Sequence, residues 1–406
     1  MGKVATEATL QRGVELLSVI AHNQITSFDD YKIIQRIVKE GLAKDFFTEG
    51  DQITVKWNDG SKDYDMPFNV VHFGNVVNAD GETVPGMYLQ SHYALPGLQF
   101  DGNEAFYYCS SQLAAGTYNV TMGNSWGSNV VSGKKYQFTL TQAVPAGGQL
   151  VFTTASSTTG ALPDQSPSNW RVRSYASRTA ASHIEMVTVT EGSSGTSLGT
   201  LSSSTKYSDS GINNMQRASY GYNRWSQSGM RQWLNSSAAA GAWWTPQNVF
   251  DRPPEQLTSM RGFMAGLSSD FLEIVSPVRV TTALNTLSDS DIGTTETTTD
   301  RFFLASLEQE YCQPQLAGVE GEAWTYWKER LGGNAPQQYW QSDSVTNANP
   351  AHIRYLISNH SSAQHVRLRS ANRGFAVSTW FVTTAGYVYA SNAAGAHCPC
   401  PACVIC

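Results

Sequence analysis

Residues 223–234 read Asn-Arg-Trp-Ser-Gln-Ser-Gly-Met-Arg-Gln-Trp-Leu, and with them the chain takes up a helical periodicity. The residues that this spacing places on one helical face are Trp225, Gly229, Trp233 and Leu234. A second stretch, 259–275, carries apolar residues at i, i+3, i+4, i+7, i+11, i+12 and i+15, counted from Met260. Stripes of this width are the buried faces of amphipathic helices. The sequence therefore predicts two core helices, 223–235 and 259–275.

Beyond Val275 the pattern changes to short strands and loops that continue to the end of the sequence. The stretch Gly374–Tyr389 alternates residue types on either side of Thr384-Ala385-Gly386, which predicts a hairpin. We expect residues 210–406 to form one α+β domain in which the two helices flank a twisted antiparallel sheet. The terminal strand, Ala402–Ile405, should lie inside that sheet.

Two further helices are expected before residue 50. Residues 8–22 place apolar side chains on one face, and a second helix should begin at Ser27 and stop at Gly41. We interpret residues 1–50 as a helical base. The base either packs on its own domain or serves oligomerisation and docking to a larger particle, because an amphipathic pattern alone does not separate these roles.

From Gln52 the period of the pattern changes to two, which is typical of strands. Ile53, Val55 and Trp57 alternate with polar residues, and Asn58-Asp59-Gly60 supplies a hairpin turn. Residues 51–108 are therefore predicted to be a β region that leads into the C-terminal domain. Residues 109–209 continue in the same style, with clear strands at 117–121 and 135–140. We interpret them as an inserted β module followed by a Ser/Thr/Gly-rich connection.

Composition and charge argue against several classes of function. Only 15% of the 406 residues are charged, the net charge is −6, and Lys and Arg are scattered. Nucleic-acid binding needs a concentrated basic surface, so we expect no nucleic-acid partner. No apolar run is long enough for a transmembrane helix, and Met1–Ile20 mixes charged with apolar residues, unlike a secretory signal. We expect neither membrane insertion nor export through a signal peptide.

One motif is shared with hydrolytic enzymes. Gly123-Asn-Ser125-Trp-Gly127 matches the G-x-S-x-G pattern of serine hydrolases. That pattern requires a strand-to-helix turn, whereas a strand follows here, so a glycine-rich β turn is the preferred interpretation. The sequence contains no metalloprotease, P-loop or dinucleotide-binding motif. We predict no catalytic residue and no cofactor.

The six cysteines are unevenly spread, and four of them crowd the C-terminus: Cys398, Cys400, Cys403 and Cys406. With His397 they could ligate zinc or an iron–sulfur cluster, because thiolate and imidazole are suitable ligands. All lie in one short terminal segment, however, and in an extended strand Cys403 faces away from Cys398 and Cys400. Metal binding is therefore only a weak alternative. A disulfide is a second one, and buried or free thiols are preferred.

Five landmarks follow one another from about Ala218 onward. They are Tyr220–Asn235, which ends in Arg-Gln-Trp-Leu-Asn, then Arg301–Ser306, Leu368-Arg369-Ser370, Ala385–Val388 and Pro401–Ile405. In this order they resemble the C-type-lectin-like domains of bacteriophage and prophage proteins, a group that includes formylglycine-generating-enzyme folds and the variable proteins of diversity-generating retroelements. The resemblance implies an α+β, C-type-lectin-like (formylglycine-generating-enzyme-like) C-terminal domain, preceded by an N-terminal helical and β region and a β-rich insertion. The chain departs from the family pattern at Val366, Arg367 and Cys398.

The resemblance also implies a binding face near the C-terminus. In retroelement-diversified relatives, variable positions there alternate with a fixed scaffold, on which Trp380, Val382, Gly386 and Val388 fall. Aromatic residues mixed with small polar ones are typical of a binding surface. The predicted ligand-binding residues are His365, Arg367, Arg373, Val377, Ser378, Phe381, Tyr387, Tyr389, Ala390, Ser391, Ala394 and His397. Of these, we expect four to be exposed together above buried Trp380 and Val388: Ser378, Tyr387, Tyr389 and Ser391.

These expectations point to a non-enzymatic, adhesin-like protein. By the resemblance it is a receptor-binding protein on the tail or capsid surface of a virion, made in the host cytoplasm. Its expected partners are a bacterial surface protein or glycan, other phage structural proteins and further copies of itself in a homotrimer. Two alternatives remain open: a structural decoration protein without a receptor, and an oxidoreductase of the formylglycine-generating type, which needs a redox-active Cys pair.

Overall fold

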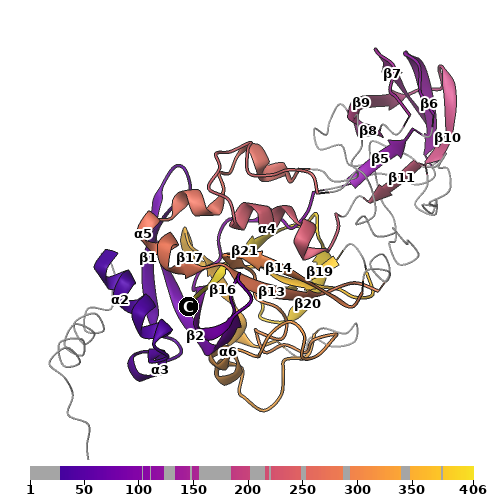
Figure 1. Cartoon of the computed structure of the whole chain (residues 1–406). Helices are drawn as coiled ribbons and strands as arrows, with labels where there is room; N and C mark the ends of the chain where they lie inside the picture. Colours follow the sequence, from indigo (N-terminus) through magenta and orange to yellow (C-terminus); the bar gives the residue numbers. More distant parts are fainter. Residues whose placement is uncertain are drawn as a thin grey trace, which may run out of the picture.

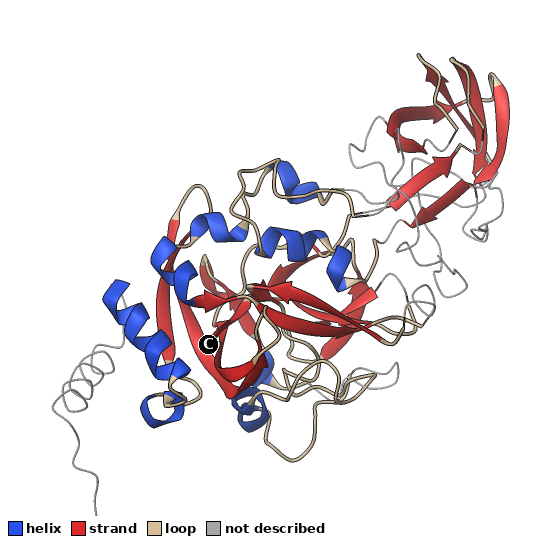
Figure 2. Ribbon diagram, viewed as in Figure 1, coloured by secondary structure: helices blue, strands red, loops and turns tan. Residues whose placement is uncertain are grey.

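Figure 1 shows the computed structural model of the chain, a mixed structure of helix and sheet in which strands dominate. It describes residues 28–102, 104–109, 111–122, 133–146, 149–154, 184–201, 215–218, 221–247, 253–286, 293–339, 348–375 and 378–406. These residues form a large core of helices and strands and a smaller module built of strands (Figure 2). The mixed class of helix and sheet that the sequence predicts is confirmed.

The first sheet of the core joins residues from both ends of the described chain. Its path runs β1 (Gln52–Asn58), β2 (Asp63–Val77), β3 (Thr83–Ser91), β22 (Ala402–Ile405) and β12 (Val275–Ser276), with β15 (Phe302–Phe303) also paired to β22. The terminal strand β22 is completely buried, as predicted, and pairs antiparallel with β3. The hairpin predicted after Gln52 is confirmed by the register of β1 against β2.

The second sheet of the core carries the predicted binding region. Its strand order is β20 (Val388–Asn392), β19 (Ser378–Val382), β18 (Val366–Ala371), β21 (Ala396–Pro399) and β4 (Leu98–Gln99). The predicted hairpin around Thr384-Ala385-Gly386 is confirmed, because β19 and β20 pair antiparallel across it. Trp380, Val388 and Leu368 point from this sheet into a hydrophobic core that also contains β1, β2, β3 and β22.

Both sheets therefore share one hydrophobic core, and this core crosses the expected boundary at residue 210. Residues of β1 to β3 pack in the same cluster as residues of β15, β18 and β22. Burial of apolar surface drives such packing, and the strands before the insertion supply much of that surface.

Among the described residues, no helix has the length and apolar character needed to cross a bilayer.

The helix predicted from Ser27 is present as α2 (Phe28–Lys39), and the chain leaves it through Gly41, whose φ is +74°. A residue without Cβ adopts this conformation at no steric cost, which explains the stop. The helix predicted over 8–22 lies outside the described residues. The remaining short elements of the core include α3 (Ala43–Phe46), η4 (Glu255–Thr258), α6 (Thr325–Arg330), η6 (Pro350–His352) and the hairpins β13 (Val278–Ala283)–β14 (Thr295–Asp300) and β16 (Arg354–Leu356)–β17 (Asn359–Gln364).

Both helices predicted after residue 220 are broken into shorter pieces. The first consists of η3 (Trp225–Gln227) and α4 (Gly229–Leu234), separated at Ser228, whose hydroxyl caps α4 by accepting from the Arg231 amide. The prediction of one continuous helix over 259–275 is wrong. Its helical parts are η5 (Phe263–Gly266) and α5 (Ser269–Ile274), separated by the two extended residues Leu267 and Ser268.

Close backbone packing explains the break between η5 and α5. A Cβ at Gly266 would collide with the carbonyl oxygen of Asn58, and one at Gly262 would collide with that of Ser236. Ser268 then caps α5 by accepting a hydrogen bond from the amide of Phe271. Phe263 and Phe271 are still fully buried, so the apolar spacing marks core residues correctly without requiring one helix.

The smaller module is a seven-stranded sheet inserted after β4. Its order is β10 (Thr196–Leu201), β6 (Gly116–Met122), β7 (Lys135–Leu140), β9 (Ile184–Glu191), β8 (Gln149–Thr154), β5 (Glu104–Tyr108) and β11 (Met215–Ala218). β5 and β11, the first and last strands of the module along the chain, pair with each other, and the amide of Tyr222 donates to the Asp101 carboxylate 3.0 Å away. The module has its own hydrophobic cluster around Tyr118, Val120 and Phe138. It therefore begins and ends at neighbouring points of the core.

Candidate functional site

The predicted binding residues come together mainly on one face of the second sheet. Strand register places Arg367 opposite Phe381, and Phe381 opposite Tyr389. Side chains of directly opposed residues lie on the same side of a sheet, so these three form one row across β18, β19 and β20. His365 and His397 extend the row, and Thr379 and Ser391 form the next one. We call this surface the aromatic face: His365, Arg367, Thr379, Phe381, Tyr389, Ser391 and His397.

Phe381 is the centre of a ring cluster on the aromatic face. The His397 ring stacks on it with centroids 4.5 Å apart and an interplanar angle of 16°. The rings of His365 and Tyr389 approach it edge-on, at 5.2 Å and 6.0 Å. Offset-stacked and edge-to-face arrangements are the favourable ones for aromatic rings, so the cluster is well defined in shape. Phe381 is buried beneath the others, while Tyr389 and His365 are exposed.

Arg367 lies under this cluster and holds the chain between β20 and β21. Its guanidinium donates to the carbonyl oxygens of Ser391, Asn392 and Gly395 at 2.8–3.1 Å and to the Thr379 hydroxyl at 2.6 Å. Its carbon Cζ is 5.9 Å from the centre of the Phe381 ring. The side chain is 1% exposed, and burial lowers its pKa to about 9. The face thus contains a buried cation bonded to neutral oxygens.

The two histidines are neutral near pH 7. Burial, and then the charge of Arg367 and the neighbouring His365, lower the pKa of His397 to about 2. The pKa of His365 is also lowered, first by burial and then by Arg367. A neutral imidazole can donate at one nitrogen and accept at the other. Nε2 of His397 is buried and has no protein hydrogen-bond partner.

Several predicted positions match the structure. Trp380 and Val388 are buried beneath the sheet and Tyr389 is exposed, as predicted. Tyr387 and Ser391, predicted to be exposed, are only half-buried, as is Ala394. Val377 lies outside the described residues.

The predicted exposure of Ser378 is wrong. Ser378 is two residues from Trp380 and therefore points to the core side of β19, where it is buried. Ala390 also packs against the core, because it alternates with Tyr389 and Ser391. Arg367 and Phe381 lie on the aromatic face but beneath its surface. Arg373 is half-buried elsewhere and donates to the carbonyl oxygen of Leu284 at 2.7 Å, so it is not part of the ring cluster.

Asn223, the first residue of the stretch quoted at the outset, positions the loop before β19. Its side-chain amide donates to the carbonyl oxygens of Asn372, Phe375 and Ser378 at 2.8–3.1 Å, and its carbonyl accepts from Asn285. The residue is fully buried. Each of these three carbonyl oxygens also accepts a backbone hydrogen bond within the loop, so Asn223 adds a second donor to each and fixes the start of β19.

A buried charged network lies on the core side of the same sheet. The Glu310 carboxylate accepts from Gln90 at 2.8 Å and from Arg354 at 2.5 Å, and its other oxygen is 2.8 Å from Nε2 of His352. Arg354 also stacks over the Trp327 ring at 4.1 Å. Burial alone would raise the pKa of Glu310, but Arg354 and His352 outweigh it and lower the pKa to about 2. The pKa of His352 is lowered by its burial.

This network connects to the turn of the β19–β20 hairpin. Nδ1 of His352 is 3.0 Å from the side-chain oxygen of Gln337, and the Gln337 amide donates to the carbonyl oxygen of Gly386 at 2.7 Å. Gly386 has a φ of +81°, and a Cβ there would collide with the carbonyl oxygen of Asn349. The hairpin that carries Tyr387 and Tyr389 is therefore anchored to a rigid support.

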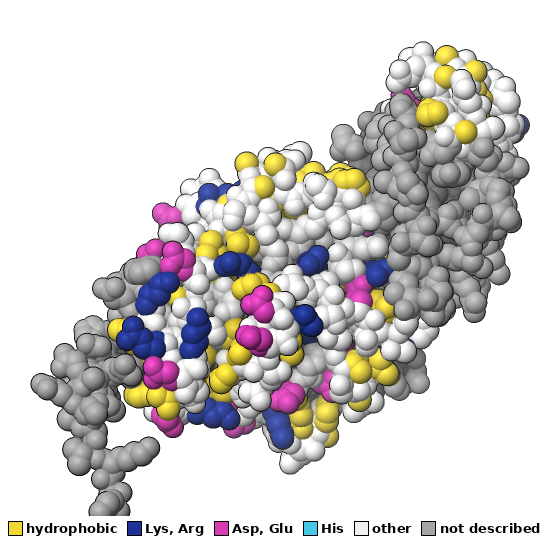
Figure 3. Space-filling model, viewed as in Figure 1, with side chains coloured by type: hydrophobic (Ala, Val, Ile, Leu, Met, Phe, Trp, Pro, Cys, Tyr) yellow, Lys and Arg dark blue, Asp and Glu magenta, His cyan; other side chains and the backbone are white. Residues whose placement is uncertain are grey.

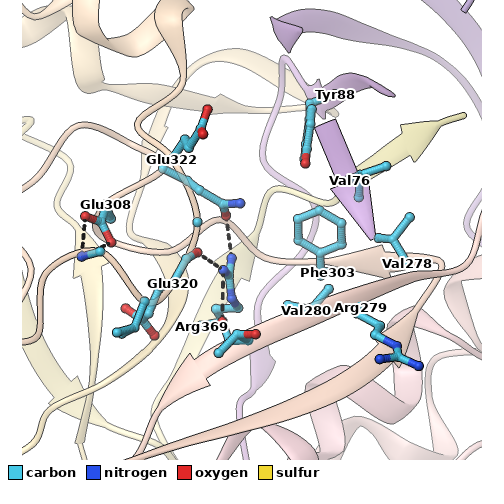
Figure 4. A pocket seen from close by; sticks show the side chains of 15 residues that line it. Val76, Tyr88, Val278, Arg279, Val280, Phe303, Glu308, Glu320, Glu322 and Arg369 are labelled. Carbon is cyan, nitrogen blue, oxygen red and sulfur yellow. Dashed lines mark hydrogen bonds between the residues drawn. The ribbon is translucent and has the colours of Figure 1, made fainter. Parts of the chain in front are cut away.

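A cavity of about 380 Å³ lies beside β13 (Figure 4). Figure 4 shows apolar residues on one side, among them Val76, Val278 and Phe303, and charged residues on the other. Arg369 donates to the side chain of Gln309 and to the backbone of Glu320, and Glu308 accepts from the Gly318 amide at 2.8 Å. Burial raises the pKa of Glu320. These bonds hold the 306–322 loop against β18, and none of the described residues that line the cavity is a Cys, Ser or His.

The C-terminal cysteines are dispersed in the core. Cys398 and Cys400 belong to a small cluster with Val366, whereas Cys403 lies in the main core. The prediction that they share one extended strand is wrong, because Cys398 lies in β21 and Cys403 in β22, strands of different sheets. All six cysteines are unpaired and buried, and burial raises the pKa of each thiol. Among the residues that the structure describes, no three His, Cys, Asp or Glu side chains are arranged to hold a metal ion.

Sequence reasoning missed the residues that support the face. Glu310, His352, Arg354 and Asn223 were not predicted to have a role. The Glu310–His352 contact joins residues 42 apart, and Asn223 reaches residues about 150 positions away. One signal was available: His352 and Arg354 alternate in a short stretch of otherwise apolar residues, and charges in such places usually have buried partners.

Comparison with known proteins identifies one family. A family model described as "Domain of unknown function (DUF6273)" matches residues 199–405, about half of the chain. No curated protein and no solved structure matches the sequence or the structure. The matched residues include the whole aromatic face and the network that anchors it, apart from Gln90 on β3.

Proposed function

This chain belongs to the DUF6273 family, and we propose that it is a non-enzymatic binding protein whose aromatic face recognises a ligand on a bacterial surface. The observation that carries the proposal is the ring cluster of Phe381, His365, His397 and Tyr389 on a sheet whose other side is locked into the core. Rigid aromatic rings with small polar neighbours provide contact area and adaptable hydrogen bonds.

The support of the face favours binding over a purely structural role. Trp380 and Val388 fill the core beneath it, Asn223 fixes its first loop and the Glu310 network anchors its hairpin turn. Binding surfaces need side chains held in place by a packed scaffold, since ordering them on contact costs free energy. A decoration protein without a receptor has no need of such an anchored ring cluster.

We extend the proposal to the C-type-lectin-like fold and to a phage or prophage origin. Its support is the order of the five sequence landmarks, which fall on consecutive parts of one core. Arg301–Ser306 contains β15, Leu368-Arg369-Ser370 lies in β18, and Pro401–Ile405 contains the buried β22. On this proposal the protein is carried on a virion tail or capsid and attaches it to the host, and a retroelement diversifies the face. A reverse-transcriptase gene and a template repeat beside the gene would test the last point.

The chemistry of the thiols favours a binding protein over a formylglycine-generating type of oxidoreductase. That reaction needs a pair of reactive thiolates that can reach a substrate. Here burial raises the pKa of every cysteine thiol, and the cavity beside β13 is lined by none. Conversion of a peptide cysteine to formylglycine by the purified chain would overturn the non-enzymatic proposal.

The binding test uses two tyrosines with the same exposure. Tyr389 on the aromatic face and Tyr355 on β16 are each 38% exposed. The labelled full chain is incubated with a panel of bacterial cells and bound label is measured by flow cytometry. Tyr387→Ala with Tyr389→Ala should abolish binding, whereas Tyr355→Ala should leave it unchanged. Equal binding by all three proteins, or no binding to any cell, would contradict the proposal.

We also propose that the chain is a homotrimer held in part by residues 1–50. The amphipathic pattern of residues 8–22 supports the proposal, whereas the apolar face of α2 packs into the core of its own chain. Light scattering of the full chain should give three times the mass of the monomer, and deletion of residues before 28 should reduce it. A monomer in both cases would contradict the trimer.

A further inference from the structure

The aromatic face belongs to a segment without acidic residues. No Asp or Glu stands after Asp343, whereas the same segment contains four arginines and four histidines: Arg354, Arg367, Arg369, Arg373, His352, His360, His365 and His397. Elsewhere on the core, side chains of both charges intermingle on the surface that Figure 3 shows. We infer that the aromatic face binds an acidic glycan, an inference that rests on the proposed binding function and names the chemistry of its ligand.

The first step of the inference is the uncompensated charge of Arg367. Its side chain contacts carbonyl and hydroxyl oxygens, and no described carboxylate forms an ion pair with it. Nε of Arg367 is buried without a hydrogen-bond partner. A buried cation normally has an anionic partner because desolvation is costly. The potential above the face is therefore positive, and an anion that covers it lowers the free energy.

Other charged and titratable groups do not cancel this potential. On β18 and β21 the titratable neighbours are His365 and His397, which are neutral near pH 7 and carry no negative charge. β19 and β20 have no acidic residue, and their remaining titratable groups are Tyr387 and Tyr389 in and beside the hairpin turn. Arg373, in the loop before β19, adds a further cation near the edge of the sheet. The charged side chains of β18 to β21 are thus of one sign. The buried carboxylate of Asp101, whose backbone bonds to Ala393, accepts from the Tyr222 amide, and no ion pair joins it to Arg367 in the described part of the chain.

The second step is the shape and chemistry of the face. Tyr389, His365 and His397 offer ring surface, and Ser391 beside them offers a short polar side chain. A sugar ring has an apolar C–H side that packs on aromatic rings and hydroxyl groups that hydrogen-bond with small polar residues and neutral imidazoles. A sugar unit that also carries a carboxylate or phosphate can pack on the aromatic rings and at the same time balance the positive charge of Arg367.

The ligand test uses polymers that differ only in charge. Polygalacturonate and its fully methyl-esterified form have the same sugar ring, and only the first is anionic. Binding of the immobilised full chain to polygalacturonate should be detectable and should weaken with salt, while the ester should not bind. Phosphomannan against neutral mannan provides the matching pair for a phosphate group. Equal binding of the charged and neutral members of both pairs would overturn the inference.

A matched pair of variants tests whether the charge acts at this face. Ser391→Asp places a carboxylate beside Arg367, and Ser391→Asn is nearly the same size without the charge. Affinity for the acidic polymer that binds should fall about ten-fold or more with Asp and change less than about three-fold with Asn. Melting temperatures confirm that both variants are folded.

The two proposals fail in different ways. If both variants bind the acidic polymer equally, or if neither acidic polymer binds, the acidic-glycan inference is wrong. The proposed function still stands in that case, provided that Tyr387→Ala with Tyr389→Ala abolishes attachment to cells. If the tyrosine double variant attaches to cells normally and the acidic polymers do not bind, both proposals are wrong.

Discussion

Two fully buried arginines lie on opposite sides of the second sheet, and their surroundings differ in one respect. Arg354 is 2.5 Å from the Glu310 carboxylate, which His352 and Gln90 also contact. Arg367 contacts oxygens without charge. The pKa of Arg354 is raised, because Glu310 outweighs the effect of burial, whereas burial lowers the pKa of Arg367 to about 9.

This difference separates a structural charge from one that is available to a ligand. Around Glu310 each buried charge has a partner, so the network gains nothing from a further ion and serves to hold the hairpin turn. Under the aromatic face Arg367 has no anionic partner, and a ligand can supply that negative charge. The structure thus places a compensated cluster beneath the sheet and an uncompensated one on top of it.

The largest expected effect follows from breaking the compensated cluster. Glu310→Gln removes the carboxylate and leaves Arg354 as a buried cation without an anion. We expect the free energy of unfolding at pH 7 to fall by about 3–5 kcal/mol, as for other buried pairs that lose one partner. Urea unfolding followed by tryptophan fluorescence measures it.

A surface carboxylate provides the control. Glu322 lies 3.5 Å from His72, and its side chain is 85% exposed. Glu322→Gln should change the free energy of unfolding by less than about 0.5 kcal/mol. If Glu310→Gln were equally mild, the network would not be the support that we describe.

Removing Arg367, the cation without an anionic partner, should lower the free energy of unfolding by less. Arg367→Met deletes the hydrogen bonds to Asn392 and Gly395 but leaves no unpaired charge behind. We expect a loss of about 1–3 kcal/mol, the range for buried groups that lose a hydrogen-bond partner. Arg354→Met should cost more, because it leaves Glu310 charged and buried. If urea unfolding showed the larger loss for Arg367→Met, the proposed difference between the two arginines would be wrong.

The fold was predictable where one pattern fixes a local element. The alternation after Gln52 and the helix start at Ser27 follow from local sequence pattern alone, whereas the terminal strand Ala402–Ile405 is what the family resemblance implies. The stretch 259–275 shows where this fails. Its apolar spacing is helical, but Gly262 and Gly266 pack against backbone from distant segments, and that contact is invisible in a single sequence.

The sequence predicted which aromatic residues form the site, but not which of the predicted site residues are buried. The period of two correctly put Trp380 and Val388 below Tyr389. The same period, applied to Ser378, would have placed it beside Trp380 on the core side, yet the implied variable positions placed it on the surface. The burial of Arg367 depends on carbonyl oxygens more than twenty residues away, which no local pattern contains.

Lowering the pH should reduce the free energy of unfolding, because His397 is buried in the ring cluster. The pKa of His397 is lowered from 6.5 to about 2, so the unfolded chain binds a proton more readily than the folded chain. Stability therefore falls as the pH drops below 6.5, and at pH 5 this histidine alone accounts for about 2 kcal/mol relative to pH 7. His397→Phe keeps the stack on Phe381 without titrating. Its loss of stability between pH 7 and pH 5 should be smaller by about that amount, and an unchanged slope would show that His397 is protonated freely.

The smallest expected effect is a change in the free energy of unfolding when a carboxylate is placed near Arg367. Ser391→Asp puts a carboxylate on the row next to Phe381, near the cation that lacks a partner. Asp and Asn are similarly unfavourable in strands, so a comparison of Ser391→Asp with Ser391→Asn isolates the charge. We expect the Asp variant to be the more stable of the two by up to about 1 kcal/mol in low salt, with the difference shrinking at high salt. The change that weakens ligand binding would then stabilise the fold, because the new carboxylate occupies the place of the ligand. A less stable Asp variant would mean that the charge of Arg367 is already balanced.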